Sequence, residues 1–411
     1  MTLDLIQTVA FAGLVLFLGY GIKRRSRLLD RYNIPAPVIG GLLVAAAITM
    51  ARARGLTLLS LDTTLQTPLM IAFFTSIGFG ASLQLLRVGG PAVALFLGAS
   101  TVVAVGQNVV GVLVALGLGQ HPLMGVLAGS VTLTGGPATG LAFAPLFEAA
   151  GVPGAATLAV AAAMVGIVSG GVIGGPIGTH LIERRGLRPS PPAAVLAAPP
   201  DPVAAHVVEE RLPEPAPAGP PSEDVEYYGL LKALVLVLTA MWAGAWISRG
   251  FAAAGATLPA YIGAMLAAAA LRNIDDLTGL LGISQRIVDD LGNVALSLFL
   301  VLALMTLRLW ELAGLAAPLA VILIAQVGLI AVASLWLMPR LMGRDYDAAV
   351  MSGGFCGFML GTTANAMANM GALVERYGPA PRAYLVVPMV GAFFIDFTNA
   401  LIITGFLNIW R

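Results

Sequence analysis

The sequence has few charged residues, one cysteine and three histidines among its 411 positions. Charged residues make up 10% of the chain and apolar residues 58%, whereas a soluble domain carries roughly 25% charged residues. A chain of this composition cannot cover a water-facing surface, so we expect a polytopic membrane protein. The single cysteine, Cys356, excludes an internal disulfide, and three histidines provide no metal-ligand cluster. A net charge of +1 argues against nucleic acid as a partner.

Ten apolar stretches are long enough to cross the lipid bilayer. They cover residues 3–22, 35–51, 66–86, 91–118, 155–180, 229–248, 257–271, 291–307, 313–338 and 383–406. Two further stretches, 122–150 and 346–378, are rich in small residues and too polar to face lipid. We predict that both are re-entrant hairpins, because irregular backbone is tolerated at membrane depth only where protein surrounds it.

The basic residues are distributed unevenly between the two sides of this predicted arrangement. The segments on one side hold 17 of the 22 basic residues, and those on the other side hold 5. Cytoplasmic loops carry the excess of Lys and Arg, so we predict that both termini lie outside and the middle of the chain lies in the cytoplasm. The first apolar run is followed by Lys23-Arg24-Arg25, which predicts a retained helix instead of a cleaved signal peptide.

Residues 186–226 differ from the rest of the chain. They contain eleven of the 26 prolines, most of the glutamates and few large apolar residues. This composition is typical of a disordered linker, here in the cytoplasm. It divides the chain into two halves, 1–185 and 227–411, each with five predicted spans and one hairpin.

The two halves align at a nearly constant offset of 224 residues. Ile34–Ala36 falls on Leu258–Ala260, and Gly129 falls on Gly353. Five spans separate equivalent positions, and because five is odd the halves are inverted relative to one another. Inverted repeats with an interrupted segment in each half are typical of secondary transporters. We therefore predict an all-α membrane protein with two inverted five-span repeats, each with a re-entrant hairpin.

Glycines and small polar side chains occur together at both hairpin tips. Glycine lets a backbone approach a ligand closely, and a helix that begins after a tip directs free N–H groups and its positive dipole end at the pocket. This arrangement suits a carboxylate. The predicted substrate-binding residues are Thr134, Gly135, Gly136, Thr139, Gly361, Thr362, Thr363, Asn365 and Asn369. Glycines also allow close helix packing, which is the role we predict for Gly170-Gly171 and Gly174-Gly175.

Asp396 is the only acidic residue deep inside a predicted span. A carboxylate at that depth costs on the order of 2.5–3.5 kcal/mol on insertion scales, so it should face the interior of the bundle and meet a cation, a proton or a hydrogen-bond donor. We predict a sodium site formed by Asp396 with oxygen ligands from Asn399, Ser130 and Thr132. The alternative is a structural hydrogen bond from Asn399 or from a hairpin backbone.

Three segments near the end of the chain, Ala366–Met370, Glu375–Pro379 and Leu385–Asp396, carry a resemblance to a known family. The chain resembles the bacterial sodium/glutamate symporters from its first span to its last, with only the linker outside the resemblance. The resemblance implies sodium-coupled import of L-glutamate across the bacterial inner membrane. The outside location that the basic residues predict for both termini is then the periplasm. The resemblance also implies a homodimer, and an elevator movement of the hairpin-bearing part against a dimerisation scaffold. Sodium is the coupling ion, and no other cofactor is implied.

The chain departs from this family pattern at both hairpins. Pro137-Ala138 stands where family members commonly carry histidine and glycine, and Thr363-Ala364-Asn365 stands where a proline is often found. These departures leave open a second hypothesis, an elevator carrier of another small dicarboxylate or a hydroxy acid, coupled to sodium or to protons. A third hypothesis is a channel or sensor without stoichiometric coupling. An enzyme is not expected, because no nucleophile–base pair, cofactor motif or metal set occurs.

Overall fold

The computed structural model describes residues 2–32, 34–55, 59–189, 223–253, 258–312 and 314–410. These residues are mainly helical, and their only β pairing is one isolated bridge between Thr2 and Ser60. Within them, seven helices are long and apolar enough to cross a membrane: Leu5–Arg25, Ala36–Ala53, Gly90–Gly117, Ala155–Arg185, Tyr227–Ala253, Gln285–Met305 and Ala316–Met342. The prediction of an all-α polytopic membrane protein is confirmed.

Of the other three predicted spans, one is a short helix, one is a 19-residue helix whose C-terminal end carries Arg272, Asp275 and Asp276, and one is interrupted. Helix α4 runs over Gln66–Phe79 and α11 over Ala260–Thr278. The last span is divided into α17 (Pro381–Met389), the π-helical turn η5 (Val390–Phe394) and α18 (Ile395–Ile409). Pro388 lies inside α17 and removes one backbone donor, which accounts for an irregular turn directly after it.

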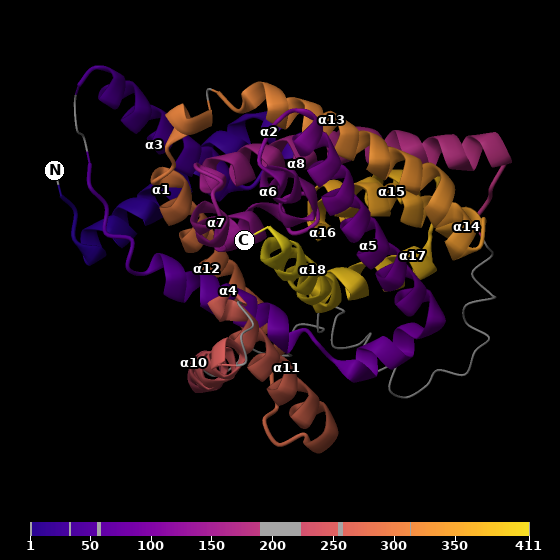
Figure 1. The fold of residues 1–411 in the computed structure, drawn as a ribbon. Coiled ribbons are helices and arrows are strands. Elements are labelled where there is room, and N and C mark those ends of the chain that lie inside the picture. Colours follow the sequence, from indigo (N-terminus) through magenta and orange to yellow (C-terminus); the bar gives the residue numbers. More distant parts are fainter. Residues whose placement is uncertain are drawn as a thin grey trace.

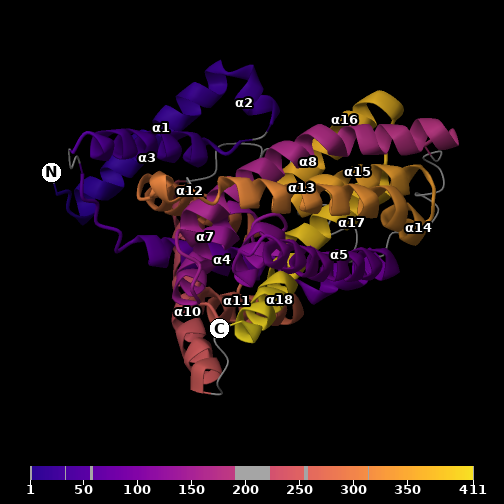
Figure 2. The same ribbon diagram turned by 45° about the horizontal axis from the view of Figure 1, so that its top comes forward.

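The helices pack as two groups. The first helix group contains α1 (Leu5–Arg25), α2 (Arg27–Arg31), α3 (Ala36–Ala53), α4, α10 (Glu223–Ala253), α11 and α12 (Gln285–Met305). Within it, α4 packs on α11 and α12, α10 packs on α11, and α3 packs on α1 and α12. In Figure 2, α1, α3, α10 and α12 lie on the left, and α5, α8, α13 and α15 lie on the right.

The second group, called here the hairpin group, is built around two long helices. Its remaining elements surround α5 (Leu83–Gly117) and α8 (Ala155–Arg185). They are α6 (Pro122–Val126), η1 (Leu127–Val131), α7 (Gly136–Ala149), α13 (Ala316–Val332), η4 (Ala333–Leu337), α14 (Met338–Met342), α15 (Tyr346–Leu360), α16 (Thr363–Tyr377) and α17–α18. Few close backbone approaches join the two groups, chiefly α12 with α7 and α4 with η5, and the short 3₁₀ turn η3 (Leu309–Leu312) lies between them. Apolar side chains of α3 and α12 also pack with those of α7 and α8 in one buried cluster. Figure 1 shows α18 crossing in front of this group.

Both predicted hairpins form pairs of short helices. The first consists of α6 and η1, a turn, and α7; the second consists of α15 and α16, which pack against each other. Every residue of α15 is buried, and α15 lies along α8. A helix that is apolar on all sides is expected to be surrounded by protein or lipid, and here protein surrounds it.

The predicted linker lies mostly outside the described residues. Helix α8 ends at Arg185 with Gly186 in the left-handed conformation as its cap, as the predicted boundary requires. Helix α10 begins at Glu223, so four residues assigned to the linker, 223–226, belong to a helix.

Alternate glycines of α8 make room for the second hairpin. A Cβ atom on Gly170 would lie 3.1 Å from Cβ of Leu360, and one on Gly174 would lie 2.8 Å from the carbonyl oxygen of Gly353. A Cβ atom added to Gly171 or to Gly175 would have no neighbouring atom within 4 Å. The packing role predicted for the two glycine pairs therefore holds for the first member of each pair.

We expect Gly174→Ala to destabilise the protein by about 1–3 kcal/mol, because the added methyl group overpacks the contact between α8 and the second hairpin. Gly175→Ala is the matched control, and it is expected to leave stability unchanged or to raise it by up to about 1 kcal/mol through helix propensity. Thermal unfolding in detergent compares the two variants. Equal shifts would contradict close packing at Gly174.

Candidate functional site

The two hairpin tips meet. A Cβ atom on Gly136 would lie 3.4 Å from Cγ2 of Thr362 and 3.5 Å from the carbonyl oxygen of Gly361. Gly136 also has φ +69°, a conformation that side chains with a Cβ atom rarely adopt. The first tip therefore needs glycine at this position both for its turn and for its approach to the second tip.

Both tips lead into helices whose first turns have no side-chain cap. Helix α7 has Gly135 at its N-cap and α16 has Thr362, and neither residue accepts a backbone N–H through its side chain. The first N–H groups of a helix lack partners within the helix, and together with the dipole they attract anions. Pro137 in the first turn of α7 removes one of these donors, so α16 presents more of them.

A buried glutamine connects the two hairpins. Gln107 of α5 accepts a hydrogen bond from Oγ1 of Thr134 (2.7 Å) and donates one to the carbonyl oxygen of Met359 (2.9 Å). Gln326 of α13 donates to the carbonyl oxygen of Gln107 at 2.6 Å. Both glutamines are fully buried. The side chain of Gln107 therefore joins the tip of the first hairpin to the last turn of α15.

Gln107 and Gln326 were not among the site residues predicted from the sequence. The available signal was their polarity, because an amide in the middle of a predicted span must find a partner there.

Two predicted substrate residues face α8. Nδ2 of Asn365 donates to the carbonyl oxygen of Ile167 (2.8 Å), and Nδ2 of Asn369 donates to that of Gly170 (3.0 Å). These bonds hold α16 on α8, and the buried Oδ1 atom of Asn365 has no hydrogen-bond partner among the described residues.

Two predicted threonines lie closer to the tips. Thr139 is buried and its side chain lies beside Gly135. The Oγ1 atom of Thr363 lies against Gly391 in η5, so the start of α16 contacts the interrupted part of the last span.

A second polar cluster lies where η1 contacts α18. Nδ2 of Asn399 donates to the carbonyl oxygen of Ser130, whose own N–H donates to Oδ1 of Asn108; both distances are 2.9 Å. Oγ of Ser130, Oδ1 of Asn399 and Nδ2 of Asn108 are buried and have no hydrogen-bond partner among the described residues. Buried polar atoms are nearly always paired, so unpaired oxygens on adjoining residues indicate a ligand position.

The backbone of η1 is irregular at the same place. Gly129 has non-helical dihedral angles (φ −101°, ψ −128°) inside this π-helical turn. Thr132, directly after η1, donates its hydroxyl hydrogen to the carbonyl oxygen of Leu127 at 2.7 Å, so its oxygen keeps an accepting lone pair. Irregular turns free backbone carbonyl groups, and such carbonyls coordinate sodium in transporters with interrupted helices.

Asp396 precedes Asn399 by three residues on α18, so both lie on one face of the helix. Its side chain is half-buried and has no hydrogen bond or ion pair with another residue that the structure describes. The fully buried Tyr261 of α11 lies within electrostatic range of it, and the hydroxyl group of Tyr261 also has no described hydrogen-bond partner. Asp396 thus lies where the hairpin group faces the first helix group.

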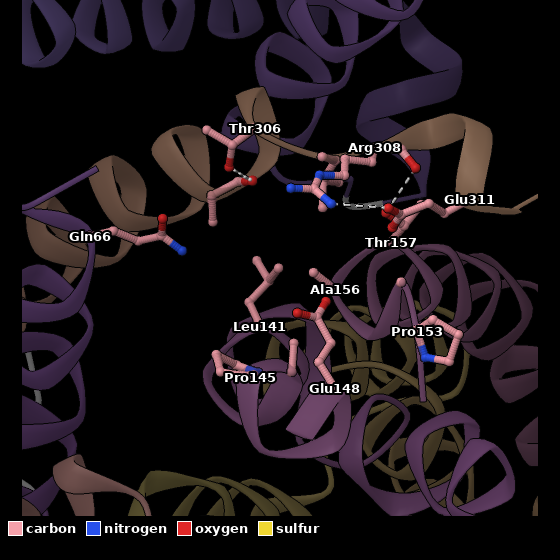
Figure 3. A pocket seen from close by; sticks show the side chains of 14 residues that line it. Gln66, Leu141, Pro145, Glu148, Pro153, Ala156, Thr157, Thr306, Arg308 and Glu311 are labelled. Carbon is pink, nitrogen blue, oxygen red and sulfur yellow. Dashed lines mark hydrogen bonds and ion pairs between the residues drawn. The ribbon is translucent and has the colours of Figure 1, made fainter. Parts of the chain in front are cut away.

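A crevice of about 400 Å³ separates the first hairpin from the first helix group. It is lined along α7 from Leu141 to Glu148, and on the other side by the end of α12 and by Arg308 and Glu311. Figure 3 shows Glu148 and Gln66 pointing into the crevice from opposite sides, with Arg308 paired to Glu311 at 3.4 Å. The crevice therefore extends along α7 toward the tip.

Interrupted hairpins that meet inside an apolar helical bundle, with free helix ends and unpaired oxygens beside them, define a secondary transporter. The family model for the sodium/glutamate symporter matches residues 1–379. The chain is 38% identical over 403 residues to the sodium/glutamate symporter of Haemophilus influenzae, covering 98% of this chain and 96% of the relative. It is 39% identical over 406 residues to that of Escherichia coli, covering 98% of both. The chain belongs to the sodium/glutamate symporter family and is not an enzyme, as the sequence predicted.

Proposed function

We propose that this protein imports L-glutamate across the bacterial inner membrane together with sodium ions. The names of its relatives support the substrate and the coupling ion. The observation that carries the proposal is the meeting of the two uncapped tips next to the unpaired oxygens of Ser130 and Asn399. It combines a place for an anion with a place for a cation.

The tips bind the carboxylates of the substrate in this proposal. The backbone N–H groups at Gly135-Gly136 and at Gly361–Thr363 donate to carboxylate oxygens, and the hydroxyl groups of Thr134, Thr139 and Thr362 add polar contacts. No Lys or Arg occurs at either tip, so the helix ends supply the positive potential. Asn365 and Asn369 act by fixing α16 on α8, and the free oxygen of Asn365 remains available to the ammonium group.

Sodium binds between η1 and α18 in this proposal. Asp396 supplies charge, Asn399 and Ser130 supply their unpaired oxygens, and Thr132 supplies its accepting lone pair. Asn108 positions Ser130 through the backbone of η1. Because η1 continues directly into the first tip, an ion that orders η1 also orders the tip, and the ion and the substrate each bind more tightly when the other is present.

Transport proceeds by an elevator movement in this proposal, with the hairpin group sliding against the first helix group. Each group takes helices from both halves of the chain: α1–α4 and α10–α12 form one, and α5–α8 and α13–α18 form the other. Such a division supports two inverted repeats, 1–185 and 227–411, joined by the cytoplasmic linker 186–226. The first helix group forms the homodimer, both termini lie in the periplasm, and the crevice beside α7 is the outer access route.

Competition binding separates this proposal from a carrier of dicarboxylates or hydroxy acids. We expect labelled L-glutamate to bind the purified protein in sodium but not in choline, and unlabelled glutamate to displace it where succinate or malate in large excess does not. Glutamate carries one ammonium group and two carboxylates. A site that contacts groups of both charges discriminates strongly against analogues that lack the amine. Equal displacement by malate, or uptake driven by a pH gradient without sodium, would favour the other carrier.

A further inference from the structure

Three arginines line a second cavity, of about 320 Å³, at the predicted cytoplasmic face. Arg185 is the last residue of α8, Arg340 lies in α14, and Arg344 follows the left-handed turn at Gly343. Among the residues that the structure describes, those that line this tri-arginine cavity are all arginines. Three like charges facing one space repel one another unless an anion lies between them.

None of the three arginines forms an ion pair with any residue in the described part of the chain, although acidic residues lie close by in sequence. Glu183 instead accepts hydrogen bonds from Arg376 (3.1 Å) and Tyr377 (2.6 Å). Asp345 accepts one from Arg382 at 2.8 Å. The nearby carboxylates therefore serve other partners, and the charge of the cavity stays uncompensated by them.

Arg344 is held in an unfavourable backbone conformation. Its φ of 60° makes it the only non-glycine residue with positive φ in the described ranges. This conformation destabilises the fold when the residue has a Cβ atom. Such backbone strain is found chiefly at functional sites. Glycine would serve this turn better, as it does one position earlier at Gly343 (φ 111°), so the turn itself does not require arginine here.

The cavity lies where spanning helices reach the membrane surface. It joins the last residue of the span Ala155–Arg185 to the end of the span Ala316–Met342. Trp336, one turn before Arg340, is 63% exposed, and the guanidinium group of Arg340 lies 5.0 Å from the centre of its ring. Exposed tryptophan beside arginine is typical of the interface between membrane and water.

We propose that the tri-arginine cavity binds the phosphate of an anionic phospholipid in the inner leaflet. Guanidinium groups donate paired hydrogen bonds to phosphate oxygens, and basic pockets between the cytoplasmic ends of spanning helices suit lipid headgroups. The exposed indole of Trp336 favours a lipid over free phosphate, since it offers an apolar surface to the glycerol and acyl region beside the charge. The lipid bridges α8 to the turn that starts the second hairpin, and this role is independent of which substrate is transported.

The test compares lipids on the purified full-length protein by thermal unfolding and by native mass spectrometry. The probes are phosphatidylglycerol, phosphatidylcholine and inorganic phosphate. We expect phosphatidylglycerol alone to stabilise the protein and to stay bound. In the triple variant R185Q/R340Q/R344Q its affinity falls roughly a hundredfold, since each arginine near an anionic lipid contributes about fivefold.

Arg249→Gln is the matched control. Arg249 lies 4.2 Å from the ring centre of Trp246 and donates to the carbonyl oxygen four residues earlier, like Arg340, but on the predicted outer side. This variant should keep the full response to phosphatidylglycerol.

Arg344→Gly provides a readout that does not depend on loss of folding. It should raise the unfolding temperature without lipid, because the backbone strain is relieved, and reduce the shift caused by phosphatidylglycerol. An unchanged response in the triple variant and in Arg344→Gly would overturn the proposal. Stabilisation by inorganic phosphate equal to that by phosphatidylglycerol would also overturn it, and would identify a site for soluble phosphate compounds.

Discussion

Asp396→Asn is expected to raise the sodium concentration for half-maximal glutamate uptake by roughly ten- to hundredfold, since a contact to a charged group contributes about 1.5–3 kcal/mol. The substitution keeps the shape of the side chain and removes its charge. Asp396 has no hydrogen bond or ion pair with a described residue that would be disturbed, so the loss should fall on the cation. Uptake at varied sodium and saturating glutamate measures the effect.

The control for this variant is Asp290→Asn, which removes an exposed carboxylate on α12. It should leave the sodium dependence unchanged. Ser130→Ala should shift the sodium half-saturation in the same direction as Asp396→Asn but by less, because it removes one neutral oxygen. A sodium half-saturation that stays at the wild-type value in Asp396→Asn would remove this residue from the cation site.

Gln107→Leu is expected to raise the glutamate half-saturation by roughly five- to a hundredfold, since leaving buried partners unpaired costs about 1–3 kcal/mol. The hydroxyl group of Thr134 and the carbonyl group of Met359 lose their shared hydrogen-bond partner. The two hairpins are then no longer held in the same relative position. Glutamate binding to purified protein in saturating sodium measures the effect.

Gln326→Leu separates this bridging role from the general cost of losing a buried amide. Gln326 is equally buried and bonds to the backbone of Gln107, but no hydrogen bond from its side chain to either hairpin is seen in the described residues. It should lower thermal stability as Gln107→Leu does, with a smaller change in glutamate affinity. Equal losses of affinity in both variants would mean that Gln107 does not align the tips.

The fold was predictable from the sequence wherever local composition decides it. The apolar runs and the small-residue stretches predicted helices and two hairpins, because a bilayer permits few other backbone arrangements. The interruption of the last span was not predicted. Pro388 was visible, but whether a proline bends a helix or produces a π-helical turn depends on the neighbours that pair with the freed carbonyl groups.

The candidate site was predictable only in part. Ser130 and Asn399 were assigned to one site from their polarity, and the structure places them in contact. Asn365 and Asn369 were assigned to the tip, yet both donate to α8, because polarity alone does not specify which face of α16 meets which neighbour. The hydrogen bond from Gln107 to Met359 joins residues 252 positions apart in the sequence, and no local pattern encodes such a contact.

Uptake of labelled L-glutamate into proteoliposomes, with and without an inward sodium gradient, decides whether the hairpin tips and the unpaired oxygens beside them form a coupled transporter. We expect glutamate to accumulate above its external concentration only while the sodium gradient lasts, and Asp396→Asn to abolish that accumulation at low sodium. Glutamate that merely equilibrates, at the same rate with or without sodium, would contradict coupling and indicate a channel. Folded protein that shows no glutamate uptake under either condition would contradict the proposed substrate.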